Sequence, residues 1–117
     1  MIRVPWDIEE VVALVDICAR SEENRLGAKT LSDELMDISQ VLIHRGDILG
    51  IEHDEKFRNY SGIRQQYYFR ILVAFTDGRK GAPTGSPRQI DYDVVEMYRN
   101  DRAKFNEILN AFNQKYR

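Results

Sequence analysis

The sequence predicts an all-α domain: a compact bundle of four or five helices that ends in a long C-terminal helix. Apolar residues recur at the i, i+3, i+4 spacing of a helix face along most of the chain. Capping residues precede several of these stretches, and only residues 76–88 are rich in Gly and Pro like a linker. A chain of 117 residues, 43% of them hydrophobic, fits one domain spanning 1–117.

The first helix is predicted to begin after Asp7. Asp7 and Glu10 have the spacing of a capping box, and Trp6 and Val11 that of a hydrophobic staple. The apolar stripe then continues at helical spacing, and the polar residues 21–24 with Gly27 end it. The stripe consists of Ile8, Val11, Val12, Val15 and Ala19.

A second helix is predicted to begin near Thr30, with Leu31, Leu35, Ile38 and Leu42 on one face. Gly46 follows His44 and Arg45 and is expected to end it in a left-handed conformation. Residues 47–55 are expected to dock against the core as a short turn or strand.

A third helix is predicted from about Ser61 to Phe75, which completes a three-helix core over residues 1–75. Its aromatic and β-branched residues leave a strand as the alternative. Residues 76–90 are expected to form a loop that serves as a flexible connector, and 91–117 one long helix or two helices with Asp101 as a second cap.

Composition and motifs argue against several classes of protein. The one cysteine, Cys18, excludes an internal disulfide framework and is expected in the core, which fits the reducing cytoplasm. No stretch has the length of a membrane span, and no signal peptide is recognisable, so no membrane partner is expected. His44 and His53 are the only histidines, and neither has the spacing of a metal site. The glycine-rich loop also lacks the order of a phosphate loop, so we predict no cofactor, metal or catalytic site.

The charge is unevenly distributed. Residues 1–55 contain 13 Asp and Glu against 5 Lys and Arg, whereas residues 56–88 contain 7 Lys and Arg against Asp77 alone. Such asymmetry fits an anion-binding surface, but it also fits an acidic third of the chain that packs against the basic third.

The basic segment and the loop after the third helix contain the candidate contacts. Arginine forks, amides and aromatic rings suit phosphates and base edges. Phe57 and Asn59 also fit structural roles, as a core residue and a helix cap, and a solvated helix face is the alternative for the rest. The candidates for nucleic-acid binding are Lys56, Arg58, Asn59, Arg64, Gln65, Tyr68, Arg79 and Lys80.

Four segments occur in an order that resembles a known family. They are Trp6–Ile17, Leu35–Gly46, Phe57–Ile63 and Val94–Leu109. The order is similar to the helical domain at the N-terminus of many bacterial HNH-type restriction endonucleases, in which a Trp-x-x-Glu-Glu opening and a Phe-Arg-Asn-x-x-Gly-Ile helix start recur. The three-helix arrangement also looks like a Myb/SANT-type helix-turn-helix.

The resemblance implies that the third helix enters the major groove. Arg58 and Asn59 would then lie at the start of this recognition helix, and Arg64, Gln65 and Tyr68 on its exposed face. Two features depart from the family: the sequence has no His-Asn-His motif, and the loop before the third helix is acidic.

The expected function is therefore a non-catalytic DNA-binding accessory module of a restriction or phage-defence system, with a nuclease domain or another defence protein as a further partner. The alternative is a protein-interaction adaptor or inhibitor in the conflict between phage and bacterium, which could self-associate as a homo-oligomer. The C-terminal aromatic residues support that alternative, since such side chains anchor interfaces. They are Tyr92, Tyr98, Phe105, Phe112 and Tyr116.

Overall fold

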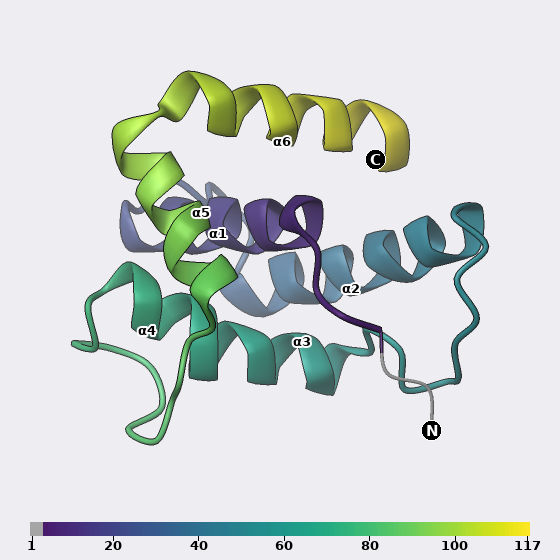
Figure 1. Ribbon diagram of the computed structural model, residues 1–117. Coiled ribbons are helices and arrows are strands. Elements are labelled where there is room, and N and C mark those ends of the chain that lie inside the picture. The colour runs from purple at the N-terminus through teal and green to yellow at the C-terminus, as the bar shows by residue number, and fades with distance from the viewer. Residues whose placement is uncertain (1–3) are drawn as a thin grey trace.

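The computed structural model describes residues 4–117, and within this range the chain is helical with no strand, as predicted. A π-helical turn, η1, joins α3 to α4 without a break, so these three form one continuous helix (Figure 1). The elements are α1 (Ile8–Glu22), α2 (Leu31–Ile48), α3 (Tyr60–Gln66), η1 (Tyr67–Ile71), α4 (Leu72–Phe75), α5 (Gln89–Asn100) and α6 (Arg102–Tyr116).

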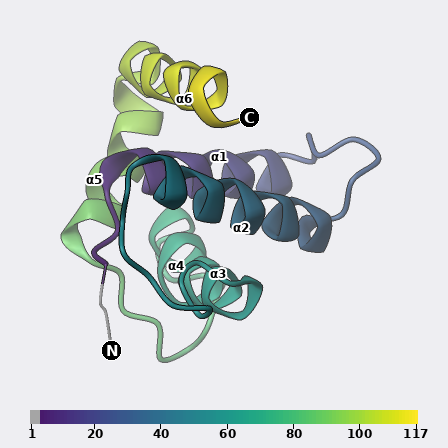
Figure 2. The same cartoon turned by 90° about the vertical axis from the view of Figure 1, so that its right-hand side faces the viewer.

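Helix α1 occupies the centre of the bundle. It contacts α2, η1, α4, α5 and α6. Figures 1 and 2 show α6 on one side of α1 and the continuous α3–α4 helix on the opposite side. Because it has neighbours all round, α1 is apolar on most of its circumference, and residues 11–15 and 17–19 are buried.

The helix starts follow the predicted caps. At α1, the Glu10 amide donates to Asp7 Oδ1 (3.1 Å) and the Asp7 amide to Glu10 Oε1 (3.2 Å). Thr30 caps α2 in the same way, with its Oγ1 3.1 Å from the Asp33 amide. Asp101 separates α5 from α6 and accepts from the Lys104 amide at 3.4 Å, so the C-terminal segment is a pair of helices.

The predicted end of α2 at Gly46 was wrong. The helix continues to Ile48, and Gly46 is buried inside it. A Cβ at this position would lie 2.6 Å from Cε2 of the Phe57 ring. The glycine therefore makes room for Phe57, which is buried as predicted.

The third helix contains a π turn that the sequence did not suggest. Ile63, Tyr67 and Ile71 are buried along it, in agreement with the predicted stripe, and a strand is ruled out. In the π turn the Leu72 amide donates to the Tyr67 carbonyl, one residue further back than in an α-helix. The Tyr68 carbonyl accepts instead from the Ala82 amide, at 2.9 Å.

This hydrogen bond fixes the loop between α4 and α5 on the helix. A Cβ on Gly81 would lie 2.7 Å from the Tyr68 carbonyl oxygen, and one on Gly85 2.6 Å from that of Phe69. Glycines therefore allow the loop backbone to approach the helix closely. The segment is a docked loop rather than the flexible connector predicted from its composition, and it ends where α5 begins at Gln89.

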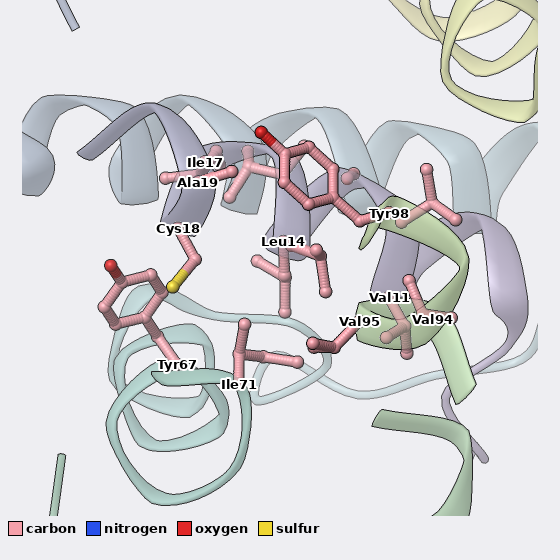
Figure 3. Packing of buried hydrophobic residues seen from close by; sticks show 14 of the residues in the cluster. Val11, Leu14, Ile17, Cys18, Ala19, Tyr67, Ile71, Val94, Val95 and Tyr98 are labelled. Atoms are coloured by element: carbon pink, nitrogen blue, oxygen red, sulfur yellow. The ribbon is translucent and has the colours of Figure 1, made fainter. Parts of the chain in front are cut away.

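The core is continuous across the bundle. Figure 3 shows Leu14 and Cys18 of α1, Tyr67 and Ile71 of η1, and Val95 of α5 meeting in one cluster. The α6 residues Phe105 and Phe112 are buried in the same core. None of the described helices combines the length and the apolar character that a membrane span needs.

Cys18 is predicted to resist thiol reagents in the folded protein. Its side chain is 0% exposed, and burial raises the pKa of the thiol to about 12, although a hydrogen bond with Tyr67 opposes the shift. Since the thiolate is the reacting species, alkylation at neutral pH should proceed only through unfolding. Iodoacetamide labelling with and without urea, followed by mass spectrometry, checks this; rapid labelling of the native protein would contradict it.

Candidate functional site

Only part of the positive charge of residues 56–88 is paired within the protein. Three of its cations pair with carboxylates: Arg58 with Glu10, Lys80 with Glu22 and Arg88 with Asp91, at 2.7, 2.8 and 3.0 Å. The other four make no ion pair with any residue in the range 4–117, so the segment keeps free positive charge. These are Lys56, Arg64, Arg70 and Arg79.

Arg58 lies inside the protein and not on the predicted binding face. It is 8% exposed, and its Nε and Nη2 donate to the two carboxylate oxygens of Glu10 at 2.7 and 2.9 Å. Nη2 also donates to the carbonyls of Val4 and Pro5, and the guanidinium stacks 3.9 Å from the centre of the Trp6 ring. A backbone φ of 49° places the residue in the left-handed region just before α3. Arg58 therefore precedes α3 as expected, but its guanidinium is bound inside the protein and is not exposed for a ligand.

The other two residues before α3 are also peripheral to the helix face. Asn59 is the N-cap of α3, and its Oδ1 accepts from the Gly62 amide at 2.8 Å, the structural role considered for it. Lys56 is exposed, but it follows the acidic residues 52–55.

The exposed face of α3–η1 brings together Arg64, Gln65 and Tyr68, as predicted. Arg64 and Gln65 are exposed, and the Arg64 guanidinium lies 5.8 and 5.7 Å from the ring centres of Tyr60 and Tyr68. We call the surface formed by Arg64, Gln65, Tyr68, Phe69 and Arg70 the α3 face.

Phe69 and Arg70 extend this surface beyond the eight candidates. Phe69 is 38% exposed and lies one turn after Gln65 on the same side of the helix. Arg70 Nη1 donates to the Ser86 carbonyl at 2.9 Å, so the docked loop orients it. Phe69 and Arg70 follow Gln65 and Gln66 by four residues, and this helical spacing could have predicted that they lie on the same side of the helix. The π turn that orients both residues cannot be recognised from the sequence.

The surface beside Arg70 is concave. A groove of about 600 Å³ is lined by Trp6, Gln66, Arg70, Arg88 and Ile90, together with Val4 and Pro5. A second hollow of about 300 Å³ shares Gln66 and Arg70 and extends under the docked loop. The α3 face is thus a helix ridge with a depression along one flank.

Arg79 and Lys80 lie away from this face, after the end of α4. Lys80 is bound to Glu22 of α1, and Arg79 Nε donates to the Thr76 carbonyl at 2.9 Å. The eight predicted residues therefore divide among three places: the segment before α3, the α3–η1 helix and the segment after α4.

The connection between α2 and α3 differs from that of a helix-turn-helix. Residues 49–59 link the two helices, whereas the motif joins its helices by a turn of about 3–4 residues. The three-helix core is present, but the long link between α2 and α3 does not support a recognition helix of the Myb/SANT type.

The two histidines lie in different surroundings. His53 Nε2 lies 2.7 Å from Asp47 Oδ1, and this hydrogen bond raises the pKa of the His53 imidazole above its usual value. The ring also stacks on Phe57 at 4.5 Å. His44 is exposed. Within residues 4–117 no three His, Cys, Asp or Glu side chains converge on a possible metal position.

The C-terminal aromatic residues mostly belong to the core. Tyr98, Phe105 and Phe112 are buried, Tyr116 is half-buried and Tyr92 is 47% exposed. The support that these residues offered for a protein-interaction surface is therefore reduced to Tyr92.

No family model, curated protein or solved structure matches this chain.

Proposed function

We propose that the protein is a non-catalytic nucleic-acid-binding module and that the α3 face contacts the nucleic acid. The observation that carries the proposal is the pair of guanidinium groups of Arg64 and Arg70. Both lie on the continuous α3–η1 helix, with Arg64 exposed and Arg70 half-buried, and neither has an ion-pair partner in the described chain. Of the other cations of the basic segment, Arg58, Lys80 and Arg88 are paired with carboxylates, and Lys56 and Arg79 lie outside this helix.

Each group on the α3 face has a matching partner in DNA. Arg64 and Arg70 supply charge for phosphates, and the Gln65 amide has the donor and acceptor needed for a base edge. Phe69 adds an exposed ring for sugar, thymine methyl or base contact. A single exposed helix fits the major groove, which is about 12 Å wide.

The proposed setting follows from the sequence motifs. We propose that the module acts in the cytoplasm as an accessory part of a restriction or phage-defence system, beside an HNH-type nuclease or another defence protein. The α3 face consists of guanidinium, amide and aromatic groups, which bind nucleic acids without reacting with them.

Binding to duplex DNA tests the proposal. A fluorescein-labelled duplex is titrated with protein at low salt and anisotropy is recorded, then the titration is repeated at increasing salt. The affinity should fall steeply with salt, and Arg64→Gln/Arg70→Gln should reduce the slope of log K against log salt by about 2, because two phosphate contacts are lost.

The matched control is Lys104→Gln/Lys115→Gln, which removes the same charge from exposed positions on α6. It should leave the slope nearly unchanged. The proposal fails if wild-type protein at high micromolar concentration leaves the duplex free at low salt, or if the control loses as much affinity as the Arg64/Arg70 variant.

A further inference from the structure

A groove on a different part of the surface is lined by three arginines. It has a volume of about 500 Å³ and lies where the end of α4 meets the junction of α5 and α6. Figure 1 shows these two places at the same end of the bundle. The arginines are Arg79, Arg99 and Arg102.

Each guanidinium is held by a backbone carbonyl at a helix end. Arg99 Nη2 donates to the Phe75 carbonyl, and Arg79 Nε donates to the Thr76 carbonyl at 2.9 Å. Arg102 Nε donates to the Tyr98 carbonyl at 2.6 Å. The C-terminal carbonyls of a helix carry partial negative charge, which favours cations there.

Two of the three guanidinium groups also lie over aromatic rings. Arg102 is 3.5 Å from the centre of the Tyr98 ring, and Arg99 is 5.6 Å from that of Phe75. The side chains are therefore oriented before any ligand arrives, which reduces the entropy lost on binding. Each guanidinium has several N–H donors, and the carbonyl contact uses one of them.

The acidic residues of the groove are neutralised by cations outside its lining. Glu22 pairs with Lys80 at 2.8 Å, and Glu23 pairs with Arg25 at 2.6 Å. Asp77 approaches Arg99 only to 3.8 Å, and its side chain is 72% exposed. Together with Lys80 and Arg25, the three arginines give five cations against the three carboxylates of Glu22, Glu23 and Asp77, so positive charge is in excess around the groove.

We propose that this groove is a binding site for phosphate groups, on a free nucleotide or on a nucleic-acid strand. Guanidinium forks match pairs of phosphate oxygens in geometry and charge. The volume is within the range of ligand pockets, about 300–1,000 Å³. The site shares no residue with the α3 face, so it does not depend on the function proposed for that face.

Pyrophosphate is the first probe. The ¹⁵N-labelled protein is titrated with sodium pyrophosphate while the arginine Nε–H signals are followed by NMR. Saturable shifts are expected for Arg79, Arg99 and Arg102 but not for Arg64. Arg99→Gln/Arg102→Gln should weaken this binding by at least about tenfold, whereas Arg64→Gln/Arg70→Gln should leave it unchanged.

Two further ligands identify the source of the phosphate. If a nucleoside triphosphate binds more tightly than pyrophosphate and short single-stranded DNA does not compete, the ligand is a free nucleotide. If the DNA displaces pyrophosphate and shifts the same arginine signals, the ligand is a nucleic-acid strand. Loss of DNA binding in the Arg64/Arg70 variant reports separately on the α3 face.

The proposal is overturned if pyrophosphate moves no Nε–H signal in the groove, or if all exposed arginines shift together in proportion to ionic strength. In either case the three arginines only cap helix ends. The Arg99/Arg102 variant would then differ from wild type in stability and in nothing else.

Discussion

Replacing Arg58 with alanine is expected to lower the free energy of unfolding by about 3–5 kcal/mol, the usual effect of breaking a buried ion pair by removing one partner. Glu10 is 2% exposed, and Arg58 is its partner at both carboxylate oxygens. The substitution also leaves the Val4 and Pro5 carbonyls without the Nη2 donor and the Trp6 ring without its stacked neighbour.

Urea unfolding followed by circular dichroism measures this effect. Since domains of this kind are stable by about 5–15 kcal/mol, the variant should unfold at a much lower urea concentration or be partly unfolded without it. Arg64→Ala is the control, because an exposed arginine without an ion pair should change stability by less than about 0.5 kcal/mol.

A second variant separates the lost pair from the lost packing. In Glu10→Gln/Arg58→Met neither side chain carries a buried charge, and the double variant should be more stable than Arg58→Ala. An Arg58→Ala protein that unfolds at the wild-type urea concentration would show that Glu10 is stable without its partner, and the structural role assigned to Arg58 would be wrong.

The parts of the fold that were predictable depend on residues close together in the chain. A capping box joins residues three apart, so Asp7 with Glu10 predicted the start of α1. The apolar stripe predicted a start near Thr30 for α2, where Thr30 and Asp33 form a second capping box. The stripe of Ile63, Tyr67 and Ile71 predicted the buried side of the third helix. Arg64 and Gln65 lie off this stripe, so they were predicted to be exposed, as they are.

The errors concern contacts between distant parts of the chain. Gly46 has the local character of a helix stop, but its role is to accommodate Phe57, which only the folded structure brings near. Arg58 has the charge of a DNA contact, but its partner Glu10 lies 48 residues earlier. The composition of a segment does not indicate which of its charges are paired internally.

The docking of the loop on η1 depends on the same kind of distant contact, and Gly81→Ala is expected to disrupt it. Gly81 has a φ of +99°, and a Cβ there would lie 2.7 Å from both the Tyr68 carbonyl oxygen and Val73 Cγ2. Two penalties therefore add: about 1–2 kcal/mol for the left-handed backbone and about 1–3 kcal/mol for the overpacking.

Gly78→Ala separates these penalties. Gly78 also has a positive φ, +80°, but a Cβ there would have no neighbouring atom within 4 Å. Gly78→Ala should therefore show the backbone penalty alone, and the difference between the two variants measures the close approach to η1. Hydrogen exchange gives an independent readout, because the Ala82 amide donates to the Tyr68 carbonyl. Its protection should fall in Gly81→Ala and persist in Gly78→Ala, and equal stability and equal protection in the two variants would mean that the loop is not held by this contact.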